Sequence, residues 1–292
     1  MKLSVIVPCY NSADTLGETL DALQNQTWPG ELEVVVADNG STDTTRQLCE
    51  TYAGRIAGLK LVDASDKRGP SYARNCGVKA AVGEVVLFCD ADDVPAEGWA
   101  AAMADALLRN DFVACRLDTD ALNSPAVRAG RGATQARGLQ RFSFLPFPHA
   151  GAGTLGIKRF LHEATGGFDE TLPICEDIDY CMKVQQRGVT LQFVPDAVIH
   201  YRLRMDPQRV YRQASQYAQF EVYLYTKYAP SVNMWELWRW RKYFRAWWLL
   251  LGRLPELLSS SDGKTLLLWR LGRLTGSLKG SIQFSGPPVM VE

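Results

Sequence analysis

The first hundred residues alternate short apolar runs with stretches in which apolar residues recur every three to four positions. Apolar runs predict buried strands at residues 3–7, 32–37, 59–62 and 84–89. After the first run, Leu16, Leu20 and Leu23 form a helical stripe. A cap near Asn11 or Ser12 is expected to begin this helix. Such alternation of strands and helices is typical of an α/β fold with a mostly parallel central sheet and helices on both faces.

Capping and breaking residues predict further helix boundaries in this region. Ser41 is placed to cap the helix after the second strand, and Asp43 suits its first turn. Pro70 is expected to begin a helix that ends by Gly83. Pro95 is expected to open the next helix.

The second half of the chain is less regular. Residues 118–150 are rich in Arg, Gly and Pro with little periodicity, which predicts a long functional loop. Further helices are expected at 158–164 and 176–187 and closing strands at 191–194 and 197–201. We therefore expect two parts, an α/β domain over residues 1–205 and a helical extension over residues 206–292.

Polar residues follow three of the predicted strands. Open parallel sheets bind ligands beyond the carboxyl ends of their strands, so these residues are candidate ligand contacts. They are Pro8, Cys9, Tyr10 and Asn11, then Asp38, Asn39, Gly40, Ser41, Thr42 and Asp43, and finally Asp90, Ala91, Asp92 and Asp93. Asp, Asn and Ser are also ordinary turn and cap residues. Their recurrence after three strands favours a ligand site.

The run from Asp90 to Asp93 carries the most specific chemistry. Two carboxylates at positions i and i+2, directly after a buried strand, can reach one hard divalent cation and a neighbouring hydroxyl pair. Mg²⁺ and Mn²⁺ favour such oxygen ligands and keep coordination positions free for substrate phosphates. A D-x-D pattern alone also arises by chance in turns.

These motifs, in this order, resemble those of family 2 glycosyltransferases. The resemblance spans about residues 1–205. It also includes Val5-Ile6-Val7 before Pro8, Arg74-Asn75-Cys76-Gly77, Gly166-Gly167-Phe168-Asp169-Glu170 and Glu176-Asp177-Ile178-Asp179. It implies the GT-A fold and the transfer of a sugar, with inversion, from a nucleotide diphosphate donor.

For the donor, the resemblance implies a contact between Asp38 and the nucleotide base. The backbone from Pro8 to Tyr10 would lie nearby, and Asn11 is included in the donor site. Asn39 departs from the pattern, because the family often has a second Asp there. The role of Asn39 in donor binding is therefore left open.

For the ribose and the metal, the resemblance implies that Asp90, beside Ala91, contacts the ribose and that Asp92 binds Mn or Mg. His200, at the end of a predicted strand, is a second candidate metal ligand, because many GT-A enzymes place a metal-binding histidine in the C-terminal part of the fold. A lone histidine is as readily a structural residue.

Asp177 is the candidate general base that would deprotonate the acceptor hydroxyl, by its likeness to the base of the family. Glu176 is the adjacent alternative. Taken without the other motifs, both acidic residues would instead be read as complementing the N-terminus of a helix.

Four arginines are candidates for binding phosphate or the nucleotide. Arg74 is assigned to the donor site, whereas Arg68 reads mainly as a solvated residue before a helix. Arg202 and Arg204 are candidates for the diphosphate oxygens.

Residues 151–156 match the pattern G-x-G-x-x-G without its required context. A dinucleotide-binding turn needs a buried strand immediately before it. Pro146 and Pro148 precede this segment, and two prolines do not fit a central strand. These glycines are expected instead to let backbone approach the donor sugar or the acceptor.

Composition narrows the setting of the protein. Of its 292 residues 47% are hydrophobic and 22% charged, as in an ordinary globular chain. Seven cysteines without a C-x-x-C pair argue against a disulfide scaffold and against a zinc ribbon, and favour a reduced, cytoplasmic setting. Pro8 interrupts the first apolar run, so no secretory signal is expected, and no apolar run reaches the ~20 residues that cross a bilayer.

The tail differs in charge from the rest. Residues 231–292 carry nine Lys and Arg against four Asp and Glu, and six of the eight tryptophans. Basic, aromatic, amphipathic helices of this kind lie in membrane interfaces. We therefore expect residues 231–275 to associate with a membrane surface; the alternative is a helix packed on the catalytic domain or on a second subunit. The acidic remainder and the lack of a binding module argue against nucleic acid.

The combined prediction is a metal-dependent, inverting glycosyltransferase with UDP as the commonest donor nucleotide of the family. Its acceptor would be a hydroxyl of a glycan or lipid-linked molecule at the inner face of the cell membrane, in the synthesis of cell-surface polysaccharide or glycoconjugate. A homo-oligomer is left open. The alternatives are a nucleotidyltransferase, although a Gly-rich phosphate loop is missing after the first strand, and a non-catalytic nucleotide-sugar-binding protein of the same fold.

Overall fold

A computed structural model describes residues 1–128, 135–203, 207–229 and 235–290. The chain divides into two compact units, which are described separately. The sheet unit consists of Met1–Leu122, Ala133–Gln140 and Phe147–Arg202, and the helical unit of Asn123–Gly132, Arg141–Pro146 and Leu203–Glu292.

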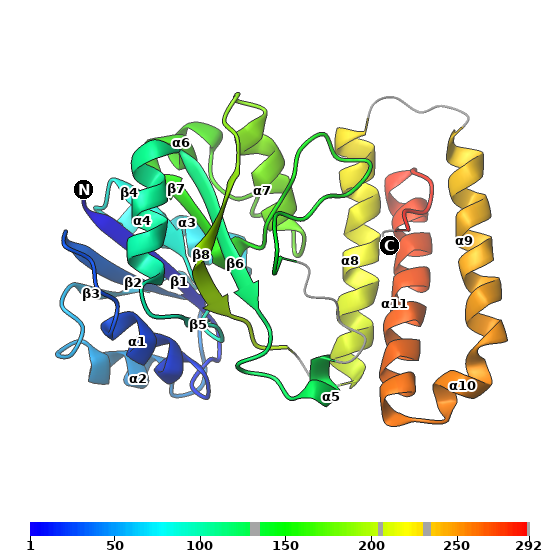
Figure 1. Ribbon diagram of the computed structural model, residues 1–292, viewed down its shortest axis with the longest axis horizontal. Coiled ribbons are helices and arrows are strands. Elements are labelled where there is room, and N and C mark those ends of the chain that lie inside the picture. The colour runs from blue at the N-terminus through cyan, green and yellow to red at the C-terminus, as the bar shows by residue number, and fades with distance from the viewer. Residues whose placement is uncertain (129–134, 204–206, 230–234, 291–292) are drawn as a thin grey trace. The chain divides into compact units, whose positions relative to one another are not determined.

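The sheet unit contains eight strands, one 3₁₀ turn and six helices among its described residues (Figure 1). The strands are β1 Leu3–Cys9, β2 Leu32–Asp38, β3 Leu59–Asp63, β4 Val85–Phe88, β5 Val94–Pro95, β6 Phe112–Asp118, β7 Leu155–Lys158 and β8 Gln192–His200. The helices are α1 Leu16–Gln24, α2 Thr45–Tyr52, α3 Pro70–Ala80, α4 Trp99–Arg109, α6 Arg159–Thr165 and α7 Glu176–Gln185, with the 3₁₀ turn η1 over Ala152–Thr154.

The eight strands form one sheet in the order β3-β2-β1-β4-β7-β6-β8-β5. Strands β3, β2, β1 and β4 are mutually parallel, and β6 is parallel to β8. Strand β7 is antiparallel to both β4 and β6, and β5 is antiparallel to β8. The predicted α/β class with a mostly parallel sheet is confirmed.

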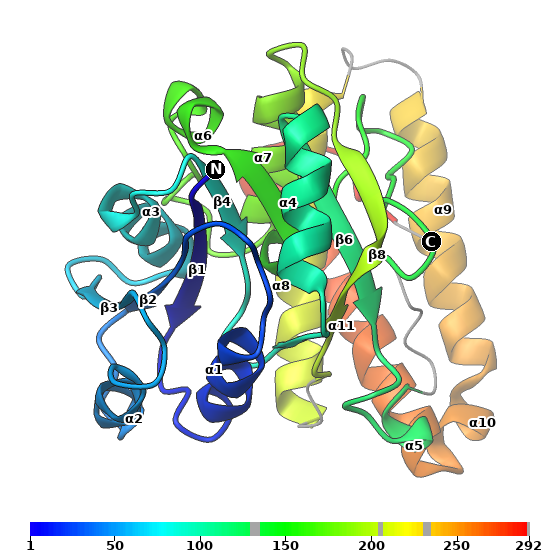
Figure 2. The same ribbon diagram turned by 60° about the vertical axis from the view of Figure 1, so that its left-hand side comes forward.

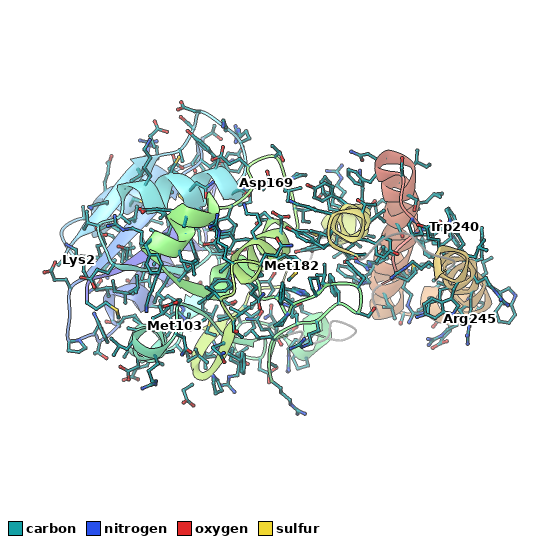
Figure 3. The ribbon with its side chains drawn as sticks, turned by 90° about the horizontal axis from the view of Figure 1, so that it is seen from above. Lys2, Met103, Asp169, Met182, Trp240 and Arg245 are labelled. Carbon is teal, nitrogen blue, oxygen red and sulfur yellow. The ribbon has the colours of Figure 1, made fainter. Side chains whose placement is uncertain are left out.

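Helices cover both faces of the sheet, as the strand patterns require (Figure 2). Val5 and Val7 of β1 share a buried cluster with Leu20 of α1 and Met103 of α4. Ile6 faces the other side, where Gly77 lets α3 approach so closely that a Cβ atom there would clash with it. Seen from above, α3 and the Met103 helix lie on opposite sides of the sheet (Figure 3). Strand residues therefore alternate between two cores.

Several predicted boundaries need correction. Helix α2 begins after Thr44 and not behind Ser41, whose hydroxyl accepts the backbone N–H of Asn11 instead. For α1, the residue before the helix is Thr15 and no side chain caps it. Pro95 does not open a helix: it belongs to the edge strand β5, where a proline is tolerated, and α4 starts after Gly98.

The later strands also differ from expectation. β6 was not predicted, and the two predicted closing strands are one strand, β8, whose register against β6 shifts between Cys115 and Arg116. The predicted loop over residues 118–150 holds the short helix α5 (Pro125–Arg128) and a bridge between Gln140 and His149; residues 129–134 lie outside the described part. The helix expected at 176–187 is confirmed as α7.

The helical unit is built on three long helices. Its elements besides α5 are α8 Pro207–Tyr228, α9 Trp235–Gly252, α10 Leu254–Leu258 and α11 Ser261–Phe284. Helix α11 lies between α8 and α9 (Figure 1). A second hydrophobic core joins α9, α10 and α11 through the buried residues Tyr243, Leu250, Leu257, Leu267 and Leu274.

Glycines at every fourth position allow α11 to pack directly on the backbone of α8. A Cβ atom at Gly272, Gly276 or Gly280 would clash with the carbonyl oxygens of Tyr211, Ser215 and Gln219 respectively. Across the same contact, Arg273 makes two hydrogen bonds of 2.6 Å to the buried carboxylate of Glu221. The chain thus pairs α8 and α11 by close backbone approach and one bidentate ion pair.

Within the described residues, no helix is long and apolar enough to cross a membrane. All seven cysteines are free thiols, and six of them are buried.

Candidate active site

The carboxyl ends of β1, β2 and β4 meet at one edge of the sheet. Cys9 pairs with Asp38 across β1 and β2. Cys89, one residue beyond β4, donates its backbone N–H to the carbonyl of Ile6 in β1, at 3.1 Å. The three segments with candidate donor-binding residues therefore start side by side, as the parallel sheet predicts.

Asp38 is fully buried where β2 ends. Arg46 of α2 donates to its Oδ2 atom at 2.9 Å, and the backbone N–H of Ser41 donates to its Oδ1 atom at 3.2 Å. The Sγ atom of Cys9 lies 3.8 Å from Oδ1. Protein donors thus contact both oxygens, so a nucleotide base at Asp38 would have to use an acceptor position that these donors leave open. The pairing of Arg46 with Asp38 was not predicted from the sequence.

The side-chain amide of Asn39 is used entirely within the protein. Its Nδ2 atom donates to the carbonyl oxygens of Ala64 and Lys67 at 2.6 and 2.7 Å, and its Oδ1 atom accepts the N–H of Gly69 at 2.8 Å. An aspartate lacks the two donors that these carbonyls need. The departure from the family pattern at this position therefore fits the local backbone, and the amide anchors the segment that leads into α3.

Pro8 lies within β1, and Tyr10 and Asn11 belong to the loop that follows the strand. Asn11 has a left-handed backbone (φ 48°), and its Oδ1 atom accepts the N–H of Thr42 at 2.8 Å, which ties this loop to the one after β2. Tyr10 is 46% exposed, and the guanidinium of Arg68 lies 4.4 Å from the centroid of its ring. The sequence indicated mainly a solvated residue at Arg68. In the structure Arg68 covers an exposed aromatic ring beside the strand ends.

Arg74 joins two of the predicted motifs. Its guanidinium donates to Oδ1 of Asp90 at 2.7 Å and to Oε1 of Glu176 at 2.8 Å, and lies 5.5 Å from the ring centroid of Phe168. The arginine is almost completely buried. Acidic residues that lie 86 positions apart in the sequence are thus held by one cation. Arg74 bridges protein carboxylates here, whereas the sequence assigned it to the donor.

The next residue, Asn75, anchors the Gly166–Glu170 motif. Its amide accepts the N–H of Phe168 at 2.9 Å and donates to the carbonyl of Phe168 and the carboxylate of Glu170, each at 3.0 Å. Lys183 of α7 donates to the carbonyl of Gly167 at 2.7 Å. These bonds hold the Gly166–Glu170 segment against α3 and α7.

Asp177 lies in the first turn of α7, behind Cys175 in a left-handed conformation (φ 62°). Its Oδ1 atom accepts the N–H of Ile178 at 2.8 Å, so it does complement the helix start. Burial, and then the neighbouring Glu176, raise the pKa of Asp177 to about 7, against the opposing effects of the Ile178 amide and Arg74. A carboxylate of this pKa can accept a proton near neutral pH.

Asp90 and Ala91 are packed against other parts of the sheet unit. The Thr15 hydroxyl donates to the carbonyl of Ala91 at 3.0 Å. A Cβ atom at Gly153 would come within 2.9 Å of the Asp90 carboxylate. The G-x-G-x-x-G segment thus forms the turn η1 and the start of β7, and Gly153 makes room for Asp90. It is not a dinucleotide-binding turn between a strand and a helix.

Asp92 and His200 lie on adjacent segments. Val94, two residues after Asp92, pairs with His200 across β5 and β8. The backbone carbonyl of Asp92 also accepts a hydrogen bond of 3.2 Å from Nε of Arg202. The backbone N–H of Arg202 donates to Oδ1 of Asp93 at 3.1 Å. Arg202 thus links the segment after β4 to the end of β8.

The donor set of Asp92 and His200 fits a divalent metal. The Nδ1 atom of His200 lies 2.7 Å from Oδ2 of Asp118, which leaves Nε2 as the ring nitrogen for a metal. Carboxylate-supported histidines are common metal ligands, and Mn²⁺ and Mg²⁺ take few protein ligands when they also bind phosphates. Among the described residues, no three His, Cys, Asp or Glu side chains form a ready-made metal site.

The structure thus brings together Asp90, Glu176 and Asp177 around Arg74, and places Asp92 two residues before Val94, which pairs with His200. Asp38 and Asn39 lie at the same sheet edge but are engaged by protein groups. Arg204 lies outside the described residues.

A profile for "Glycosyl transferase family 2" matches residues 4–165, more than half of the chain. The chain belongs to this family. Membership of the family favours glycosyl transfer over nucleotidyl transfer.

Two curated relatives match this chain closely over about a third of its length. The poly(ribitol-phosphate) beta-N-acetylglucosaminyltransferase TarS of Staphylococcus aureus is 46% identical over 95 residues, which are 32% of this chain and 16% of TarS. The glycosyltransferase AglE of Haloferax volcanii is 34% identical over 98 residues, 33% of this chain and 32% of AglE. The match therefore spans less than two thirds of these relatives' own length.

Solved structures agree over nearly the whole chain. A mannosyltransferase from Pyrobaculum calidifontis, in complex with GDP-Man and Mn²⁺, superposes with a TM-score of 0.65 at 24% identity over 96% of this chain and 86% of that one. Residues 1–349 of S. aureus TarS in complex with UDP-GlcNAc give 0.55 at 23% identity, over 98% and 93%. These likenesses show the fold, which is of the GT-A type.

Proposed function

We propose that this protein is a glycosyltransferase that moves a sugar from a nucleotide diphosphate donor to a hydroxyl group, with inversion at the anomeric carbon. One observation carries the proposal: Arg74 ties Asp90, at the donor edge of the sheet, to Glu176 and so to the start of α7. Groups proposed for the donor and for proton transfer are thereby held in one network. Family membership supports glycosyl transfer as the reaction class, and the GT-A fold is consistent with it.

In this proposal Asp177 is the general base. It accepts the proton of the acceptor hydroxyl as the oxygen attacks the anomeric carbon and the bond to the nucleotide diphosphate breaks. A pKa of about 7 matches this task, because the carboxylate is available near neutral pH and is basic enough to take the proton. Glu176 is held in an ion pair with Arg74, which makes it the weaker candidate.

The donor would lie along the strand-end segments, with Tyr10, Asn11 and Asp38 near the base and Asp90 near the ribose. UDP is proposed as the nucleotide. Of the two solved structures above, TarS carries UDP-GlcNAc and the archaeal enzyme GDP-Man, so they support a nucleotide sugar without favouring one base.

Asp92 and His200 would hold Mn²⁺ or Mg²⁺. The bound ion would neutralise negative charge on the departing diphosphate. The archaeal structure above contains Mn²⁺ together with its nucleotide sugar. Arg202 is placed beside this position by its bonds to Asp92 and Asp93, and it is proposed to contact the diphosphate.

For the acceptor, we propose a hydroxyl of a glycan or lipid-linked molecule, at the inner face of the cell membrane, in surface polysaccharide or glycoconjugate synthesis. The names of TarS and of other relatives refer to polymeric acceptors. Catalysis is assigned to residues 1–205 and attachment to the helical extension. Oligomerisation stays open.

The test is a panel of nucleotide sugars, with and without Mn²⁺ or Mg²⁺, scored by hydrolysis and by thermal shift. The proposal expects one nucleotide sugar to raise the melting temperature, more so with metal, and to be hydrolysed slowly. Asp177→Asn should keep the thermal shift and lose turnover. Asp196→Asn, on an exposed residue of β8, is the matched control. Binding without turnover in the wild type would favour a non-catalytic protein of this fold.

A further inference from the structure

Helix α9 is apolar on two opposite sides. On its inner side, Tyr243 and Leu250 are buried, and Trp240 and Trp247 pack against the same core of the helical unit. Its outer side consists of exposed large apolar residues: Leu237, Trp238, Phe244, Trp248, Leu249 and Leu251. We call these six residues, with Arg241 and Arg245, the outer face of α9. Figure 3 marks Trp240 and Arg245 on this helix.

The outer face is far more exposed than a folded chain requires. Trp248 is 74% exposed and Leu237 71%. Positions 237, 241, 244, 248 and 251 follow the helical repeat, so they form one stripe along α9. Contiguous exposed apolar surface of this kind marks an interaction site.

The charges on α9 indicate what covers that surface. Residues 237–252 contain four Lys and Arg and no Asp or Glu. Arg241 and Arg245 are exposed within the stripe, and Nζ of Lys242 lies 4.1 Å from the ring centroid of Trp238. The complementary surface is therefore apolar and anionic. A second copy of this face would bring arginines against arginines, because a two-fold interface uses the same patch on both chains.

We propose that the outer face of α9 lies in the headgroup layer of an anionic membrane, parallel to its surface. The tryptophans and Phe244 would reach the boundary between headgroups and acyl chains, and Arg241 and Arg245 would contact lipid phosphates. This inference rests on the membrane location proposed above, and it does not depend on the chemistry of transfer.

The surface is narrower than the segment 231–275 that the sequence indicated. Within residues 266–274 of that segment, Leu267 and Leu274 are buried in the helical core and Trp269 is not exposed. Arg273 is engaged with Glu221. That segment is therefore part of the bundle. Residues 231–234 lie outside the described chain.

The test uses the full chain and two kinds of vesicle: phosphatidylcholine alone, and equal parts phosphatidylcholine and phosphatidylglycerol. Co-sedimentation is measured for the wild type, for Phe244→Ser with Trp248→Ser, and for Arg241→Gln with Arg245→Gln. The control is Leu108→Ser with Phe160→Ser, because these residues are 60% and 61% exposed in the sheet unit. Circular dichroism checks that each variant folds.

The wild type and the control should bind the anionic vesicles, and each outer-face variant should bind them at least about tenfold more weakly. Binding to phosphatidylcholine alone should be weak for all four. Equal binding by the wild type and both outer-face variants would overturn the proposal. The proposal would also be overturned if the wild type formed dimers and bound no vesicles, and if the Phe244→Ser, Trp248→Ser variant were a monomer. The outer face of α9 would then bind a second copy of the chain. Donor hydrolysis, measured without vesicles, reports separately on the proposed chemistry.

Discussion

At the scale of single residues, the candidate site is a set of carboxylates whose surroundings separate their roles. Arg74 forms ion pairs with both Glu176 and Asp90, and Arg46 forms one with Asp38. Asp177 makes its one described side-chain bond to a backbone amide, and burial raises its pKa. A carboxylate that stays basic next to carboxylates already paired with arginine is the arrangement that proton transfer needs.

The raised pKa of Asp177 predicts opposite effects of pH on activity and on stability. The base must be ionised, so turnover should rise about tenfold per pH unit below 7 and level off above it. The folded state holds this proton more tightly than the unfolded state, whose carboxyl has its ordinary pKa. Stability is therefore lost as the pH rises from about 4 to 7.

Asp177→Asn should consequently lower turnover by at least about a hundredfold and raise the melting temperature, with a gain that grows between about pH 4 and pH 7. Asp196→Asn should change neither property. Kinetic and thermal-melt profiles over pH check both effects. If Asp177→Asn kept normal turnover and the same fall in activity at low pH, the general base would be another group.

Replacing Arg74 should affect both stability and the pH profile. Arg74→Met leaves two carboxylates without their cation and should destabilise the fold by about 3 kcal/mol. Arg74 also lowers the pKa of Asp177, so any remaining activity should have its acid limb at higher pH than in the wild type. Adding Glu176→Gln to Arg74→Met should recover part of the stability. An unshifted acid limb in Arg74→Met would mean that Arg74 only supports the fold.

A third residue-scale prediction concerns Asp118. If its carboxylate orients His200 for a metal, Asp118→Asn should weaken the Mn²⁺-dependent thermal shift with nucleotide sugar by about 10- to 100-fold in midpoint concentration. The fold without metal should be little affected. Asp120→Asn, two residues away, is the control. An unchanged Mn²⁺ midpoint in Asp118→Asn would leave His200 as a structural residue.

At the scale of elements, the packing of α11 on α8 depends on its glycines. Gly276→Ala places a Cβ against the backbone of Ser215 and should destabilise the helical unit by about 2 kcal/mol. Gly252→Ala is the matched control, because no atom lies within 4 Å of a Cβ at that position. Urea unfolding followed by tryptophan fluorescence compares the two variants. If Gly276→Ala and Gly252→Ala were equally stable, the close approach of α11 to α8 would not contribute to the stability of the helical unit.

The helices and strands also show which parts of the fold could be predicted from the sequence and which could not. Strands β1, β2 and β4 were predicted because buried parallel strands form unbroken apolar runs. β6 was missed because it follows α4 after only two residues and is apolar in its first half alone. Ser41 looked like a helix cap, but its hydroxyl serves the loop after β1. Local patterns cannot show such contacts between distant loops.

The same limit applies to the site. The sequence placed Asp90, Asp92 and Asp177 correctly at an element end, since each follows a strand or begins a helix. It could not show that Arg74 bridges Asp90 to Glu176, because the partners are distant in sequence and bond through side chains. It also gave no indication that Gly153 faces Asp90, which follows only from the approach of η1 to the end of β4.

At the scale of the whole molecule, the two proposed functions depend on charges that differ in their exposure to solvent. Donor binding relies on buried or half-buried charges at a sheet edge, and lipid binding relies on exposed arginines and aromatic rings. Salt screens exposed charges far more than buried ones, and the screening length falls to roughly 4 Å at 0.5 M salt. Raising NaCl from about 0.05 to 0.5 M should therefore release the wild type from anionic vesicles.

Over the same range of salt, donor hydrolysis in solution should change by less than about threefold. The Phe244→Ser, Trp248→Ser variant should show the same hydrolysis curve as the wild type, because neither residue belongs to the sheet unit. Co-sedimentation and hydrolysis, measured on the same samples, compare the two responses directly. A parallel loss of both with salt would mean that exposed charge also governs the donor site, and the division between the two surfaces would then be wrong.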